Sequence, residues 1–115
     1  MSAKSHFGFC LKDTGKVIGS GSIAYDAEYE AYELGYNLNR KFWGLGFATE
    51  ASQAMIQWAY QNLGAHDFFA RHANANKASR NVIKKCGFQF EKYGQLPKYD
   101  GSEIFEASYY TLHIE

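Results

Sequence analysis

The stretch RKFWGLGFATE, residues 40–50, decides how this chain folds. It follows a run typical of a strand (AYELGYNLN, residues 31–39) and leads into residues 48–63, whose apolar positions recur at steps of three and four, as in an amphipathic helix. Gly44 and Gly46 have no Cβ atom to keep a ligand from the main chain. The first amides of a helix lack an acceptor within it and lie at the positive end of its dipole. The stretch therefore predicts a pocket for a phosphate or pyrophosphate.

The rest of the chain supplies the elements around this loop. On its N-terminal side we expect a hairpin, with a tight turn at residues 13–16. The expected strands cover residues 6–12, 17–25, 31–39, 66–72, 88–94 and 104–114, and the expected helices cover residues 48–63 and 77–86. The order β-β-β-α-β-α-β-β predicts one α/β domain over residues 1–115, with a mixed central sheet and flanking helices.

The connections between the elements and a few single residues predict further details of this fold. The strands at 31–39 and 66–72 must be parallel, because a helix crosses between them. Gly35, inside a strand, suggests a bulge or the close approach of another backbone. Asn76 is expected to cap the second helix, while Gly64 and Gly87 are expected to end the two helices.

Composition narrows the classes of function. The chain has 115 residues, of which 46% are hydrophobic, so it can bury a core. Twelve basic residues balance twelve acidic ones, which argues against nucleic acid or an acidic membrane as the partner. No apolar stretch approaches the roughly 20 residues that span a bilayer. Cys10, Cys86 and four scattered histidines match no metal-ligand spacing, so we expect no metal, two reduced and partly buried thiols, and a cytoplasmic protein.

Other nucleotide-binding motifs fit poorly. The pattern GxxxxGK[ST] of phosphate-binding loops is absent. The dinucleotide fingerprint GxGxxG is matched only in its first two glycines by residues 44–49, and four residues separate them from the preceding strand. Residues 19–24 match it in part as well, but they begin inside a strand and lead to no helix. A nicotinamide-dinucleotide binder is therefore the weakest of the hypotheses.

Two sequence blocks together resemble a known family. WGLGFATEA, residues 43–51, resembles the W-G-x-G-[YF]-A-T-E-A signature of the GNAT acetyltransferases. NKASRNVIKKCGF, residues 76–88, resembles their second block, N-x-x-S-x-x-V-[LI]-x-K-x-G-F. The blocks lie in the family's order and at its usual separation. The chain is most similar to the branch that acetylates the N-terminal amino groups of ribosomal proteins.

The resemblance implies a GNAT-like fold in which a splayed pair of parallel strands opens a cleft for acetyl-coenzyme A. Main-chain groups at residues 37–39 would pair with the pantetheine arm, and the amides of residues 44–49 would hold the pyrophosphate. Arg40 or Lys41 could reach a phosphate, or could simply be solvated. The cofactor-binding residues implied are Leu38, Trp43, Gly44, Leu45, Gly46, Phe47, Ala48, Thr49 and Asn76.

The implied activity is transfer of an acetyl group to a primary amine, either a protein N-terminus or a small amine, by direct attack on the thioester. An amide near Leu38 would stabilise the oxyanion. Many members place a tyrosine acid where this chain has Ile83, so Ser79 is the candidate acid, unless it only bonds its own helix. Glu33 is the candidate proton acceptor, unless it is merely an exposed strand residue.

The resemblance covers only the cofactor-binding portion of the family's fold. The family usually opens with a strand and two helices before the hairpin, and those helices form one wall of the acceptor site. The fold expected here is therefore N-terminally shortened: the chain is a fragment, or a partner supplies the wall, or the acceptor site is lost. Because uncovered apolar surface favours association, we expect a homodimer. The alternative function is a non-catalytic module that binds an acyl-coenzyme A or a protein partner.

Overall fold

The structure is a computed structural model that describes residues 4–74, 76–97 and 104–115. Its elements follow in the order β1 (Lys4–Cys10), β2 (Val17–Asp26), β3 (Ala31–Leu38), η1 (Arg40–Phe42), α1 (Phe47–Leu63), β4 (Asp67–Ala73), α2 (Lys77–Lys85), β5 (Gln89–Pro97) and β6 (Ile104–His113). This order confirms the predicted α/β class and each predicted strand and helix. The short 3-10 helix η1 was not predicted, because three residues carry no measurable periodicity.

The predicted caps account for the end of α1 and for both ends of α2. Gly64 ends α1 in the left-handed conformation, with φ 65°. The Asn76 side chain caps α2 by accepting a hydrogen bond from the amide of Ser79. Gly87, with φ 94°, follows the end of α2. The three predicted positions are therefore confirmed. Each could be predicted from one residue, either a capping side chain or a glycine.

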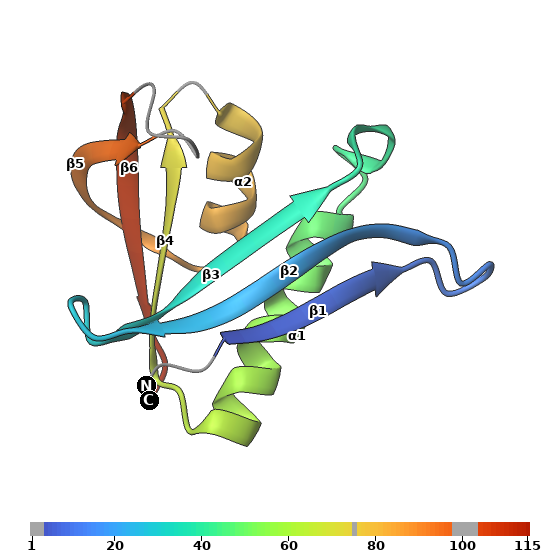
Figure 1. Cartoon of the computed structure of the whole chain (residues 1–115), viewed down its shortest axis with the longest axis horizontal. Helices are drawn as coiled ribbons and strands as arrows, with labels where there is room; N and C mark the ends of the chain where they lie inside the picture. The colour runs from blue at the N-terminus through green and yellow to red at the C-terminus, as the bar shows by residue number, and fades with distance from the viewer. Residues whose placement is uncertain (1–3, 75, 98–103) are drawn as a thin grey trace.

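The strands form a single six-stranded sheet in the order β1-β2-β3-β4-β6-β5. The neighbours β3 and β4 are parallel, as predicted, and the others are antiparallel. Within the described residues, β3 and β4 pair only through Tyr32 with Phe68 and Glu33 with Phe69. Beyond that point the two strands diverge towards their C-terminal ends (Figure 1). The sheet is thus splayed at its centre.

Both helices cover one face of this sheet. The core cluster joins alternate residues of β2, β3, β4 and β6 to α1 and α2, and it comprises Ile23, Leu34, Met55, Ile56, Ala59, Ala65, Phe68, Ala70, Ile83, Phe88 and Tyr110. The intervening strand residues, such as Glu33 and Arg71, face the opposite side of the sheet. No helix among the described residues covers that side.

The structure corrects the expectation at Gly35. The β2–β3 register runs without a shift from Ala31 to Leu38, so there is no bulge. A Cβ atom at Gly35 would lie 3.1 Å from the hydroxyl oxygen of Ser22, which is a side chain rather than a backbone. The glycine therefore accommodates its cross-strand neighbour. Cys10 and Cys86 are both free thiols, but Cys10 is exposed and only Cys86 is partly buried.

Candidate active site

A cavity of about 290 Å³ lies where β3 leaves β4, between the end of β3, the start of α1 and one side of α2. Its wall includes most of the residues predicted to bind the cofactor, together with one predicted to act in catalysis: Leu38, Trp43, Gly44, Gly46, Ala48, Thr49, Asn76 and Ser79. The two sequence blocks, separated along the chain by β4, thus form opposite walls of one cavity.

The start of α1 is built to present its amides to this cavity. Gly44 and Gly46 have φ values of 75° and 85°, which a glycine adopts without strain. Gly46 occupies the N-cap position and has no side chain to accept a bond from the helix. The first helical hydrogen bond runs from the amide of Glu50 to the carbonyl of Gly46, so the amides of residues 47–49 precede the helical ladder. This arrangement suits an anion.

Trp43 fixes the loop to the end of β3. Its indole Nε1 donates a hydrogen bond of 2.8 Å to the carbonyl oxygen of Leu38, while half of the residue stays exposed. The guanidinium of Arg40 lies 5.7 Å from the Trp43 ring centroid. The tryptophan of the first block therefore positions the loop, and the Leu38 carbonyl is already occupied by a donor.

The start of α2, unlike that of α1, is capped by a side chain. Asn76 Oδ1 accepts a 3.1 Å hydrogen bond from the amide of Ser79. The Ser79 hydroxyl in turn accepts a 3.2 Å hydrogen bond from the hydroxyl of Tyr36 on β3. Burial raises the pKa of the Tyr36 phenol, and the bond to Ser79 opposes this only in part, so Tyr36 stays protonated at neutral pH. Two hydroxyl groups thus form a short chain across the splay.

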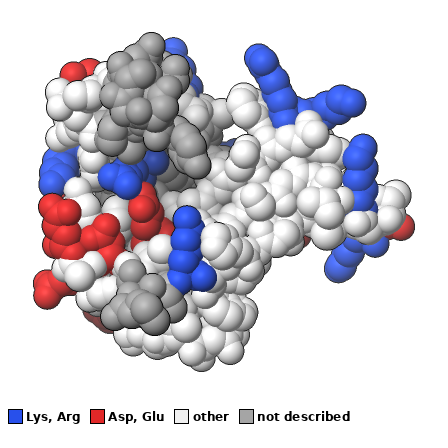
Figure 2. Space-filling view, viewed as in Figure 1, with Lys and Arg blue, Asp and Glu red and all other residues white. Residues whose placement is uncertain are grey.

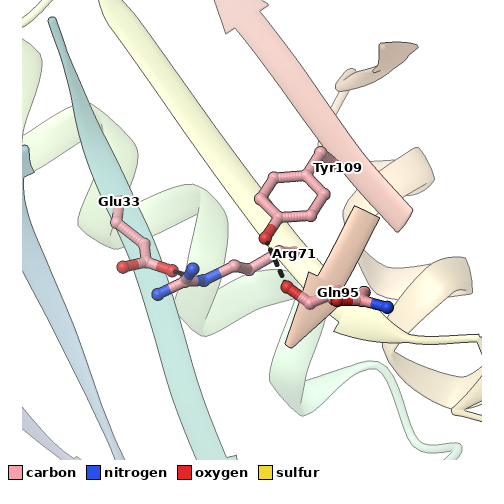
Figure 3. Close-up of polar contacts among 4 residues, drawn as sticks. All are labelled: Glu33, Arg71, Gln95 and Tyr109. Carbon is pink, nitrogen blue, oxygen red and sulfur yellow. Dashed lines mark hydrogen bonds and ion pairs between the residues drawn. The ribbon is translucent and has the colours of Figure 1, made fainter. Parts of the chain in front are cut away.

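A second cavity, of about 310 Å³, adjoins the first at Tyr36 and Ser79, which line both. It lies between the diverging strands, and its wall includes Glu33 of β3 and Arg71 of β4. Arg71 Nε donates to Glu33 Oε2 at 2.8 Å (Figure 3). Glu33 is therefore neither a solvated strand residue nor an unengaged base, since it forms an ion pair on the cavity wall.

Some residues expected near the ligand lie elsewhere. The side chain of Leu45 is 64% exposed, and the Phe47 ring lies against Phe42, with 6.0 Å between centroids. Neither residue lines the cavity, although the amide of Phe47 belongs to the start of α1. Arg40 and Lys41 are also absent from its wall. These two basic residues therefore lie in the loop without facing the cavity.

Several residues that line the two cavities were not predicted from the sequence, and the ones with polar side chains of most interest are Tyr36, Arg71 and Lys85. Lys85 could have been found, since it is the lysine of the second block and shares one face of α2 with Ala78 and Val82. Tyr36 lies two residues before Leu38 and so on the same face of the strand. Arg71 carried no signal, because its partner is 38 residues away.

The Cys86 thiol lies near the site but is not suited to nucleophilic chemistry. Burial raises the pKa of the Cys86 thiol to about 11, and its Sγ lies 3.9 Å from the carbonyl oxygen of Thr49. A thiol with this pKa is not a nucleophile at neutral pH. Among the described residues, no three His, Cys, Asp or Glu side chains lie together as a metal site would require. Over the same residues, no helix has the length and apolar character needed to cross a membrane.

The fold and the two cavities define an α/β domain built around a splayed sheet and a helix N-terminus that suits an anion. The family model described as "Acetyltransferase (GNAT) domain" matches residues 1–89. This chain belongs to that family.

Proteins with similar sequences support this assignment. An uncharacterized N-acetyltransferase, p20, of Bacillus licheniformis is 34% identical over 97 residues, which are 84% of this chain and 53% of that protein. The [ribosomal protein uS5]-alanine N-acetyltransferase of Escherichia coli is 27% identical over 78% of this chain and 47% of its own length. The chain thus spans about half the length of these relatives.

Solved structures share the fold. A GNAT-family acetyltransferase from Bacillus anthracis matches 94% of this chain and 65% of its own, with a TM-score of 0.83 and 25% identity. The microcin C7 self-immunity acetyltransferase MccE, solved in complex with acetyl-CoA and AMP, matches 86% of this chain and 56% of its own, with a TM-score of 0.74 and 25% identity. The GNAT-like fold predicted from the two blocks is confirmed.

Proposed function

We propose that this chain forms the acetyl-coenzyme A site of an N-acetyltransferase, which moves the acetyl group from the cofactor to a primary amine in a ternary complex. The observation that carries the proposal is that two cavities meet at Tyr36 and Ser79. One cavity has an anion-binding helix start on its wall, and the other has a carboxylate. A cofactor and an acceptor could therefore meet at the shared wall. The relatives named as N-acetyltransferases and the acetyl-CoA complex of MccE support the same reaction.

The proposed cofactor position follows from the groups on the first cavity. The pyrophosphate would take hydrogen bonds from the amides at the start of α1, with Lys85 adding a positive charge. The pantetheine arm would lie along the edge of β3 that β4 leaves unpaired, as an added strand does. The Nδ2 group of Asn76 would donate to that arm, since its Oδ1 is occupied by the helix cap.

The proposed chemistry uses side chains at the junction. The amine nitrogen bonds to the thioester carbon, and the amide of Leu38 stabilises the oxyanion. When the carbon–sulfur bond breaks, the thiolate takes the proton of the Ser79 hydroxyl, and Tyr36 restores that proton through their hydrogen bond. Tyr36 then regains its own proton from solvent, which balances the proton that the amine releases. The proton lost by the amine goes to Glu33 or through it to solvent. The net result is one proton moved from nitrogen to sulfur, without a covalent enzyme intermediate.

One observation favours the alternative, a non-catalytic module that binds an acyl-coenzyme A. Ile83 stands where the resemblance leads one to expect a tyrosine acid, and it is only 2% exposed within the core. No proton can come from that position. The alternative predicts cofactor binding without turnover. Both hypotheses place the cofactor in the first cavity, but only the main proposal gives Ser79 a role as the acid.

Two finer parts of the proposal concern the protein's surroundings. We infer a homodimer, because Phe90 and Tyr93 on the edge strand β5 are both exposed and lie 4.8 Å apart, which leaves apolar surface for a second copy. Light scattering after gel filtration tests this, and a monomer at micromolar concentration would contradict it.

Free thiols at Cys10 and Cys86 fit the reducing cytoplasm.

The experiment that tests the proposed function measures free thiol released from acetyl-coenzyme A with a panel of primary amines. We expect amine-dependent release, and about a 100-fold lower kcat in Ser79→Ala, the size typical of a lost general acid. Ser20→Ala, a serine exposed on β2, is the matched control and should keep the wild-type rate. Tight binding of acetyl-coenzyme A with no release for any amine would favour the non-catalytic alternative.

A further inference from the structure

The second cavity holds two opposite charges at a defined place in the sheet. Glu33 forms the last β3–β4 pair with Phe69, and Arg71 lies two residues further along β4. Their side chains are 28% and 32% exposed, so both are half-buried yet within reach of a ligand. They point towards each other across the diverging strands (Figure 3). A negative and a positive group therefore share one small cavity wall.

A second basic side chain, Lys92, lies near Arg71. The Arg71 guanidinium carbon lies 6.0 Å from the centroid of the Tyr109 ring, and Lys92 Nζ lies 5.5 Å from the same ring. Tyr109 is buried, and its hydroxyl donates a 2.9 Å hydrogen bond to the carbonyl of Gln95 (Figure 3). Two cations thus flank a fixed aromatic ring. Figure 2 shows basic and acidic atoms side by side on this part of the molecule.

We propose that the acceptor is a zwitterion, an amino acid or short peptide that carries a carboxylate close to its amine. Its ammonium group would bind at Glu33, and its carboxylate would bind at Arg71, with Lys92 adding positive potential. The inference rests on the proposed function in one respect, because the amine must then reach the thioester past Tyr36 and Ser79.

The energetics of the ion pair select for such a ligand. In the free protein each charge has a partner, which avoids leaving a half-buried charge unpaired. A ligand that carries both charges replaces both partners at once. A simple amine or a polyamine would compete with Arg71 for Glu33 and would offer no acceptor to the Arg71 guanidinium. The planar guanidinium also suits a carboxylate, which it can bind through two parallel hydrogen bonds.

The size of the cavity agrees with a small acceptor. Its volume of about 310 Å³ is near the lower end of the range for small-molecule sites. An amino acid or a dipeptide fits such a space, while a folded protein could offer only its terminal residue. The volume therefore fits a small acceptor, and the opposite charges on the wall are what point to a zwitterion.

The test titrates three probes into the full chain saturated with coenzyme A, namely L-alanine, L-alaninamide and putrescine. We expect L-alanine to bind at least about tenfold more tightly than either probe that lacks a carboxylate. Arg71→Leu should remove this preference, and Arg71→Lys should keep part of it because the charge remains. Arg80→Leu, an exposed arginine on α2, is the matched control and should leave the preference unchanged.

Each outcome has a distinct meaning. Equal affinity for the three probes, or no binding of any, overturns the zwitterion proposal. If Arg71 only clamps β3 to β4, Arg71→Leu lowers stability and weakens all probes equally, which also overturns it. Binding of L-alanine through Arg71 without acetylation supports this site while the proposed function fails. Acetylation of L-alaninamide as efficient as that of L-alanine keeps the proposed function and overturns the acceptor class.

Discussion

The starts of α1 and α2 face the same cavity, but only α2 has an N-cap side chain. α1 begins behind Gly46, which has no side chain, so its first amides are left for a ligand. α2 begins behind Asn76, whose side chain occupies the amide of Ser79. The first helix start therefore suits an anion, and the second offers side chains to a neutral group. The comparison indicates which end of the cofactor each helix would bind.

Charge reinforces this difference. Lys85 lies at the C-terminal end of α2, and the neighbouring Cys86 contacts Thr49 in the first turn of α1. The lysine charge therefore adds to the positive end of the α1 dipole. Ser79, at the other end of α2, meets the uncharged hydroxyl of Tyr36. The cavity is thus positive at one end and polar but neutral at the other.

The largest expected effect comes from filling the open helix start. Gly46→Val places a β-branched side chain at φ 85° on a residue that lines the first cavity. Strain of about 1–3 kcal/mol should displace the loop from its present conformation, and this displacement and the added bulk should weaken acetyl-coenzyme A binding at least about 100-fold. Isothermal titration calorimetry measures the change. Gly15→Val, at φ 71° in the β1–β2 turn, has a similar strain but no ligand nearby. Equal losses of affinity in both variants would contradict the assignment of the anion site to α1.

A smaller effect is expected at the capped helix start. Asn76→Ala removes the α2 cap and should lower the free energy of unfolding by about 1 kcal/mol. It should also weaken acetyl-coenzyme A binding by about fivefold, the cost of about one hydrogen bond. Asn76→Ser keeps a capping oxygen, so it should restore stability without restoring affinity. Denaturant unfolding and calorimetry separate the two effects, and full recovery of affinity in Asn76→Ser would rule out a ligand contact.

Lys85→Met should have a modest effect that depends on salt. The substitution removes a partly screened charge from the first cavity, so affinity should fall about threefold to tenfold at low ionic strength. The difference from the wild type should shrink as salt rises. Lys84→Met, the neighbouring lysine outside the cavity wall, is the control. An unchanged salt dependence in Lys85→Met would show that this lysine does not face the phosphates.

The smallest expected effect concerns the two cysteines. The raised pKa of Cys86, about 11, keeps it a thiol at pH 8, and alkylation requires the thiolate. Iodoacetamide should therefore modify the exposed Cys10 while leaving Cys86 unmodified in the folded protein. As the pH rises towards 11, Cys86 should begin to react. Mass spectrometry of peptides gives the site, and rapid modification of Cys86 at pH 8 would mean that the α1–α2 contact opens readily.

The sequence predicted the parts of this molecule that depend on local rules. The glycine-rich loop before α1, the Asn76 cap, the Gly64 end and the parallel direction of β3 and β4 all follow from neighbouring residues or from one crossover. The splay between these two strands was expected only from the family resemblance. The side-chain chemistry was harder to predict. Ser79 was identified by analogy, and Glu33 was identified because the reaction needs a proton acceptor. Ser79 lines both cavities, and Glu33 lines the second.

What could not be predicted depends on contacts between distant strands. Arg71 meets Glu33 only because β3 and β4 pair for two residues in one register. Tyr36 reaches Ser79 because α2 packs against the splay, 43 residues further along the chain. No periodicity encodes such contacts, so the ion pair and the hydroxyl chain became visible only in the folded molecule.

The measurement that tests the central claim most directly is a calorimetric titration of the full chain with acetyl-coenzyme A, with NADH as the control, at one fixed salt concentration. The open start of α1 and the unpaired edge of β3 together predict micromolar binding of acetyl-coenzyme A, about −8 kcal/mol, and none of NADH, which has a pyrophosphate but no pantetheine arm. Absence of acetyl-coenzyme A binding, or equal binding of NADH, would contradict the assignment of this cavity.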